Sequence, residues 1–259
     1  MKRAFLCLLL AILVLISSSC GTSVSTKLYQ QLNELVDEAN AVMRREITFQ
    51  MEASFSDPTG GSSGILYFLS GNGSYDRESK LAYQSYAATL LAASYTAEDY
   101  YKDGVRVHKE SDETYSMDAD MDQILSGFPY GIIEIPASEQ LQSLSLADTV
   151  NGESYSAVTS LSSSELLSRW NLDLYTLAGI TNPDYDKEKV GSTTYVIAVS
   201  NGKIVSVTIY LQVTIYEKSS YRPGYSSDAD NRLDLQITAK VSYIDDGESV
   251  NVPTVDAVA

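Results

Sequence analysis

Cysteine, histidine and tryptophan are nearly absent from this 259-residue sequence. Its two cysteines are Cys7 and Cys20, so residues 21–259 contain no thiol. Disulfides and cysteine metal sites are therefore excluded from that part of the chain. His108 is the one histidine, which also excludes zinc sites of the usual composition. Stability has to come from the core alone.

Basic residues are scarce as well. The chain holds 18 lysines and arginines against 34 acidic residues, and without Lys2 and Arg3 its formal charge is about −18. Phosphate backbones and anionic lipid headgroups repel such a surface, so nucleic-acid binding is not expected. The acidity also fits a plainer interpretation, a solubilised domain in a cation-rich cell wall.

The first 20 residues form a segment of their own. Lys2 and Arg3 precede an uncharged apolar run over residues 4–16, which is too short to span a bilayer but suits a signal peptide. Three serines then stand directly before Cys20 and Gly21. This arrangement resembles a bacterial lipoprotein export signal.

The resemblance implies cleavage before Cys20, a diacylglycerol on its sulfur, and residence on the extracytoplasmic face of the bacterial cell membrane. Residues 1–19 are then the signal peptide and residues 20–25 a lipidated tether. Ser17 departs from the pattern, since leucine is usual at that position. An ordinary secretory signal cut near Ser19 and an uncleaved anchor helix are the alternatives. Acyl chains contribute about 0.8 kcal/mol per buried methylene and would supply the membrane affinity.

Residues 26–259 are long enough for one domain, and 44% of the whole chain is apolar, as in a globular core. Apolar residues three and four apart predict a helix over residues 27–44, capped by Ser25 or Thr26. Strict alternation from Ile47 to Phe55 then predicts a half-buried strand.

Five Asn-Gly or Asp-Gly pairs follow, and such pairs favour the tight turns of antiparallel hairpins. They stand at residues 72–73, 103–104, 151–152, 201–202 and 246–247. Long alternating patterns over residues 195–200, 203–216 and 233–243 predict strands of a large antiparallel sheet with one solvated face.

Two more helices are expected on the apolar side of this sheet. One spans residues 162–178, with a capping box at its start and Gly179 at its end. A shorter one follows Asp118, with Met121, Ile124, Leu125 and Phe128 facing inward.

This order of elements, closed by Val250-Asn251-Val252-Pro253, resembles the LolA and LppX-like envelope lipoproteins, and more closely the uncharacterised Gram-positive lipoproteins that share their half-barrel fold. The resemblance implies an α+β fold: a strongly curved antiparallel sheet with about three helices on its apolar concave face. It also implies an interior able to admit acyl chains or another hydrophobic ligand. No catalytic residue is carried over.

Coverage of the apolar face decides between a cavity and a filled core. If three modest helices leave part of it open, the remaining concavity is a ligand site. If coverage is complete, the same side chains are simply core. The lining candidates are Trp170, Phe128, Val207, Ile209, Leu211, Val213, Leu235 and Ile237.

The sequence contains no complete motif for catalysis or metal binding. Residues 60–64 spell G-x-S-x-G, but a strand follows where a nucleophile elbow needs a helix. His108 alternates with Val107 and is expected on a solvated polar face with Arg106. Asp118, Asp120 and Asp122 begin like a calcium loop but lack its later residues, so they are interpreted as carboxylates at a helix start. No metal or cofactor is expected.

Three functions are compatible with these patterns. The first is a non-enzymatic binder of lipid or another hydrophobic ligand. The second is a surface module that docks a protein or wall polymer through a face rich in acidic residues and in the 19 tyrosines, which equally suit strands. The third is a carboxylate-based hydrolase, whose paired acids a sequence does not reveal. The sequence leaves the oligomeric state open.

Overall fold

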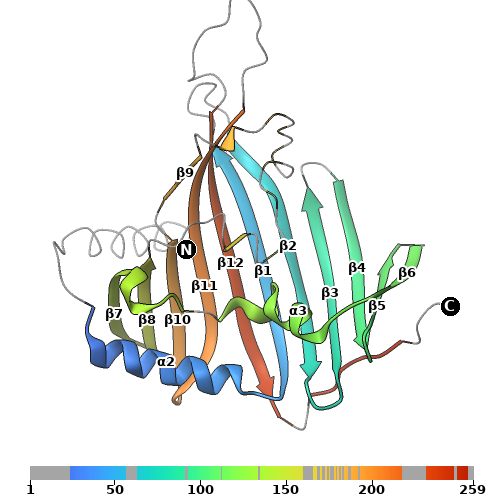
Figure 1. Ribbon diagram of the computed structural model, residues 1–259, viewed down its shortest axis with the longest axis horizontal. Helices are drawn as coiled ribbons and strands as arrows, with labels where there is room; N and C mark the ends of the chain where they lie inside the picture. Colours follow the sequence, from blue (N-terminus) through green and yellow to red (C-terminus); the bar gives the residue numbers. More distant parts are fainter. Residues whose placement is uncertain are drawn as a thin grey trace, which may run out of the picture.

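A single open antiparallel sheet dominates the computed structural model (Figure 1). The structure describes residues 24–56, 63–90, 93–111, 113–133, 135–159, 193–217, 232–247 and 250–255, and scattered positions from 166 to 191. The strands are β1 (Arg44–Ser56), β2 (Ser63–Asp76), β3 (Leu81–Leu90), β4 (Ala93–Lys102), β5 (Val105–Glu110), β6 (Glu113–Asp118), β7 (Leu141–Thr149), β8 (Gly152–Thr159), β9 (Lys189–Val190), β10 (Thr193–Ser200), β11 (Lys203–Tyr216) and β12 (Arg232–Asp246).

Eleven of these strands follow the order β6-β5-β4-β3-β2-β1-β12-β11-β10-β8-β7, and β9 pairs with β11 beside it. Every pairing is antiparallel. Since β6 and β7 stand at opposite ends, the sheet does not close. The predicted large antiparallel sheet is confirmed, and its open form is consistent with a half-barrel.

The helices among the described residues are α2 (Thr26–Asn40) and α3 (Met121–Ser126), with the short 3-10 turns η1 (Tyr130–Ile132) and η2 (Ser138–Gln140). Both helices lie over one face of the sheet, here called the inner face (Figure 1). The third helix, predicted at residues 162–178, falls mostly outside the described residues, and the number of three is not confirmed. Leu166, Leu167 and Trp170 are described there and are buried.

Alternation in the long strands builds the core at the centre of the sheet. The register aligns Met51, Ala239, Ile209, Tyr195 and Ala157 across β1, β12, β11, β10 and β8. All five are at most 2% exposed, so this row forms a closed layer of the core. A strand pattern with period two places such residues on one face, as the sequence predicts.

Helix α2 crosses the inner face near the strand ends, from β7 past β11 (Figure 1). Ser25 caps it by accepting a hydrogen bond from the backbone N–H of Leu28 at 3.4 Å. Leu32, Val36 and Ala39 form its buried stripe. The prediction that it extends to residue 44 is wrong, because the chain enters β1 at Arg44 and pairs there with β2. Strand pairing ends the helix although the apolar spacing continues.

Three of the five predicted turns join adjacent strands. Positive φ at both residues of Asp103-Gly104 and Asn201-Gly202 closes the hairpins β4-β5 and β10-β11, and Asn151-Gly152 joins β7 to β8. Asp246-Gly247 instead follows the last strand. Asn72-Gly73 lies inside β2, so its prediction as a turn is wrong.

Gly73 serves close packing instead of a turn. A Cβ at this position would lie 2.8 Å from the hydroxyl of Tyr130. That hydroxyl donates to the backbone carbonyl of Tyr83 and also lies 3.4 Å from that of Ser74. Burial raises the pKa of Tyr130, so the group stays protonated and remains a donor. The glycine therefore lets η1 rest directly on β2 and β3.

We expect Gly73→Ala to lower the free energy of unfolding by about 1 to 3 kcal/mol, because a methyl group would push Tyr130 from its carbonyl partners. Urea unfolding of the single and double variants with Tyr130→Phe measures this. Removing the hydroxyl relieves the contact, so the two changes together should cost less than their sum. A neutral Gly73→Ala variant would contradict the account.

Candidate ligand-binding cleft

The predicted lining residues on β11 and β12 lie in the core. Val207, Ile209, Leu211, Val213, Leu235 and Ile237 are at most 2% exposed and pack in one large cluster with Trp170. Val213 and Leu235 also border a cavity of about 360 Å³ between β9 and the ends of β11 and β12. Their role as ligand contacts remains a prediction. Phe128 and Trp170 differ, because they border a larger cavity beside α3.

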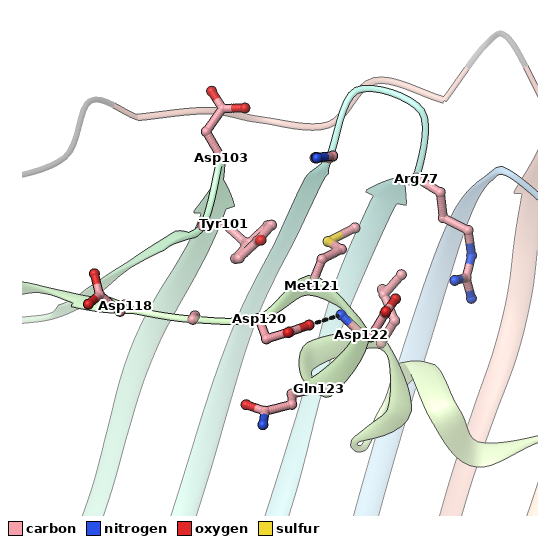
Figure 2. A pocket seen from close by; sticks show the side chains of 12 residues that line it. Arg77, Tyr101, Asp103, Asp118, Asp120, Met121, Asp122 and Gln123 are labelled. Carbon is pink, nitrogen blue, oxygen red and sulfur yellow. Dashed lines mark hydrogen bonds between the residues drawn. The ribbon is translucent and has the colours of Figure 1, made fainter.

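Helix α3 stands over β2, β3 and β4 and frames a cleft on the inner face. It is anchored by Leu125, which packs against Tyr75, Ala82 and Tyr101 of these three strands. Figure 2 shows the outer part of this cleft, about 800 Å³ in volume, between α3 and the loops at the strand ends. Arg77 stands on one side and Asp118 on the other.

The aspartates of this outer cleft do not form a shared site. Asp120 is the N-cap of α3 and accepts a hydrogen bond from the backbone N–H of Asp122 at 2.7 Å, which confirms the predicted carboxylate at a helix start. The carboxylates of Asp103 and Asp118 point away from it (Figure 2). Among the described residues, no group of three or more acidic, histidine or cysteine side chains could hold a metal ion.

The inner part of the cleft, about 470 Å³, continues between α3 and β3–β5. The outer and inner parts share five lining residues: Tyr101, Asp118, Ala119, Asp120 and Gln123. Trp170, Phe128 and Ile124 are apolar members of the lining of the inner part, and the two aromatic residues are called the aromatic wall. The Phe128 ring lies 5.5 Å from that of Trp170 and 5.7 Å from that of Phe49, measured between centroids. The aromatic wall is therefore tied to the core of β1.

In the lining of the same cleft, three side chains converge on the carboxylate of Asp99. Gln84 donates to it at 2.6 Å, Arg106 at 2.8 Å through Nε, and His108 contacts it at 2.8 Å through Nδ1. Cross-strand register brings the four together, since Gln84 and His108 are the partners of Asp99 on β3 and β5. Gln84, Asp99 and Arg106 all line the inner cleft.

This network keeps Asp99 ionised although the residue is only 6% exposed. Burial alone would raise the pKa of the carboxyl, but the hydrogen bonds from Arg106, Gln84 and His108, with the charge of Arg106, hold it below its usual value. A charged but neutralised pair thus faces the cleft. Sequence reasoning missed Gln84 and Asp99, because only the pairing of β3, β4 and β5 reveals them.

The prediction of a solvated His108 is wrong. The residue is 6% exposed and its ring stacks on Tyr115 at 4.8 Å. Alternation does place it on one face with Arg106, but that face is the inner one. Its Nε2 atom lies 3.5 Å from Glu110, so both ring nitrogens face carboxylates and neither contacts a hydroxyl nucleophile.

The G-x-S-x-G stretch at residues 60–64 lies mostly outside the described residues, and β2 begins at Ser63.

Tyrosines are divided between the two faces of the sheet. Tyr83 and Tyr100 donate to Glu98 at 3.1 and 2.9 Å on the outer face, whereas Tyr86 and Tyr95 pack edge to face on the inner face beside the cleft. No single tyrosine platform results.

Comparisons with known proteins give structural similarity only. No protein-family model matches the chain, and no curated protein matches its sequence. LprF from Mycobacterium bovis is similar at a TM-score of 0.47 and 11% identity, over 90% of this chain and 99% of that one. A DUF1329 family protein from Desulfovibrio piger gives 0.27 and 7%, over 90% and 96%. A beta-barrel-like DUF1849 protein from Brucella abortus gives 0.25 and 9%, over 79% and 100%.

Within the described part of the chain, no helix is both long enough and apolar enough to cross a membrane.

We expect Asp99→Asn to lower the free energy of unfolding at neutral pH by about 2 to 4 kcal/mol, because Arg106 would lose its buried counter-charge. Glu98→Gln, the same change on the outer face, should cost well under 1 kcal/mol. Since the pKa of Asp99 is lowered in the folded state, its stabilisation is present above the unfolded value near 4 and is lost as pH falls through the folded value. Denaturation at several pH values should show the difference between wild type and Asp99→Asn shrinking below about pH 4. A pH-independent difference would contradict this assignment.

Proposed function

We propose that this protein is a non-enzymatic lipoprotein that binds a lipid or another hydrophobic ligand in the cleft beside α3. The observation that carries the proposal is the inner cleft of about 470 Å³, whose lining combines aromatic side chains with a neutralised ion pair. Sites for small molecules commonly have this size and this combination of apolar lining with a few fixed polar groups.

The lining favours an amphipathic ligand. Trp170, Phe128 and Ile124 offer an apolar surface, and burying a chain there contributes about 25 cal/mol per Å² of apolar area. Arg106 and Gln84 also line the inner cleft, and each has further N–H groups besides the one that it donates to Asp99, which a polar end of the ligand could accept. The outer cleft gives such a polar end a route to solvent. The divergent carboxylates there support binding over hydrolysis.

Membrane attachment through Cys20 belongs to the same proposal. The export signal ends at this residue, and the charge of about −18 downstream of it opposes adsorption to anionic lipids. Acyl chains on Cys20 would hold the domain at the extracytoplasmic face.

Filling the cleft should abolish binding. Ala119 lines both parts of the cleft, so Ala119→Phe places a ring in the space the ligand would occupy. The chain from residue 20 with Cys20→Ser keeps every described element. We expect it to bind a fluorescent fatty acid saturably, and Ala119→Phe to weaken this binding at least tenfold.

The matched control is Ala93→Phe, which adds the same ring at an exposed position at the start of β4 and should leave the affinity unchanged. Native mass spectrometry of the same protein should detect a co-purified lipid. No probe binding and no bound lipid would remove the proposal, as would equal affinity in the Ala119→Phe variant.

The anchor is tested separately in a bacterial host. We expect wild type to incorporate labelled fatty acid and to sediment with membranes, and Cys20→Ser to do neither, because no other cysteine follows. Membrane association of Cys20→Ser at the wild-type level would contradict lipidation as the attachment.

A further inference from the structure

Arg77 lacks the carboxylate partner that three other arginines of this acidic chain have. Arg44, Arg106 and Arg232 each pair with an aspartate at 2.8 to 3.0 Å. Among the described residues, no carboxylate pairs with Arg77, and its Nε atom is buried without a hydrogen-bond partner. Buried donors in folded proteins almost always have a partner. The unpaired guanidinium therefore points to a partner that the chain itself does not provide.

The position of Arg77 is fixed by its neighbours. The residue directly follows β2 and lines the outer cleft (Figure 2). Its backbone N–H donates to the carbonyl of Met43 at 2.9 Å, and its Cζ atom lies 5.4 Å from the centre of the Tyr75 ring. Tyr75 is buried and packs against Leu125 of α3. The contacts that anchor α3 thus also hold the guanidinium, so a ligand would meet it preorganised.

A second basic residue lines the same cleft. Lys80 lies in the turn between β2 and β3, is exposed, and has no ion pair among the described residues. Arg106 in the inner cleft differs from both, because Asp99 neutralises its charge. The unpaired positive charge of the cleft therefore belongs to its outer part.

We propose that Arg77 and Lys80 bind one negative charge at the polar end of the ligand, which makes the ligand an anionic amphiphile. This inference rests on the proposed function, since the apolar part of the same molecule lies in the inner cleft. The two parts of the cleft share Tyr101, Ala119 and Gln123, so one molecule can reach both. A guanidinium beside an ammonium suits a carboxylate or a phosphodiester, whose oxygens accept hydrogen bonds from both.

The aspartates of the outer cleft limit the charge that binds there. All four that line it are exposed, so water and salt screen them, whereas Arg77 is half-buried. The carboxylates of Asp103 and Asp118 point away from Arg77 (Figure 2), and that of Asp120 caps α3. Together they still repel a second negative charge on the ligand. The lining therefore favours a monoanion over a dianion.

Three ligands with the same twelve-carbon chain test the headgroup: laurate is anionic, dodecanol neutral and dodecyltrimethylammonium cationic. Each competes with the fluorescent fatty acid for the Cys20→Ser chain from residue 20, at neutral pH and below its micelle concentration. We expect laurate to bind about tenfold more tightly than dodecanol, and the cation to bind most weakly. Acetate, which carries the charge without the chain, should not displace the probe.

Variants of the two basic residues test the assignment. Arg77→Gln should remove the advantage of laurate over dodecanol, and Arg77→Lys should keep part of it, because the charge remains but the planar fork is lost. Lys80→Gln should reduce the advantage by a smaller factor. Dodecanol should still displace the probe from each variant, which shows that the variant is folded.

The matched control is Lys203→Gln, which removes the same charge from another exposed position, at the start of β11 and outside both parts of the cleft. It should keep the full advantage of laurate. The ratio of the two affinities is compared within each variant, so a change in the affinity of the probe itself cancels.

Five results would overturn this inference and leave hydrophobic binding intact. They are equal affinities for laurate and dodecanol in wild type, tighter binding of the cation, displacement by acetate, an advantage of laurate that persists in Arg77→Gln, and its loss in Lys203→Gln. No binding of the probe or of any of the three ligands would instead remove the proposed function, and this inference with it.

Discussion

The two described helices cover only part of the inner face of the sheet, and the difference between the covered and uncovered parts determines where a ligand could bind. Over β8, β10, β11, β12 and β1 the alternating apolar side chains meet α2 and one another and are fully packed. Toward β3, β4 and β5 the only helix among the described residues is the six-residue α3, which packs on the sheet through Leu125. The sheet therefore has a closed half and a partly open half.

Different interactions stabilise the two halves. In the closed half, burial of apolar area provides the stability, and a cavity of about 360 Å³ lies at the ends of β11 and β12. In the open half, Asp99, Arg106, His108 and Gln84 satisfy one another, which lets polar groups stay buried beside a cavity. Tyr130 secures the boundary, because its hydroxyl fastens η1 to β2 and β3 and so positions Phe128 between Phe49 and Trp170.

Local patterns in the sequence predict the strands but do not predict the cleft. Alternation from Ile47 to Phe55 and along β11 and β12 is a nearest-neighbour property, and it predicts these strands correctly. The prediction of a turn at Asn72-Gly73 is wrong because the glycine makes room for Tyr130, which stands 57 residues later in the chain. The prediction of a solvated His108 is wrong because its cross-strand partner is Asp99, with which it is buried on the inner face. The sequence predicts that Phe128 faces inward beside a short helix and distinguishes Trp170 as the one tryptophan, but the space beside them depends on where α3 rests.

Fluorescence of Trp170 is the most direct measurement of whether an apolar group occupies the open half, because this is the one tryptophan in the chain. A fatty acid brominated along its chain quenches tryptophan on close contact and can be titrated against the Cys20→Ser protein. The account predicts saturable quenching that follows the same binding curve as an unlabelled competitor. Binding of the fatty acid without quenching of Trp170 would contradict it, because the ligand would then lie elsewhere on the sheet.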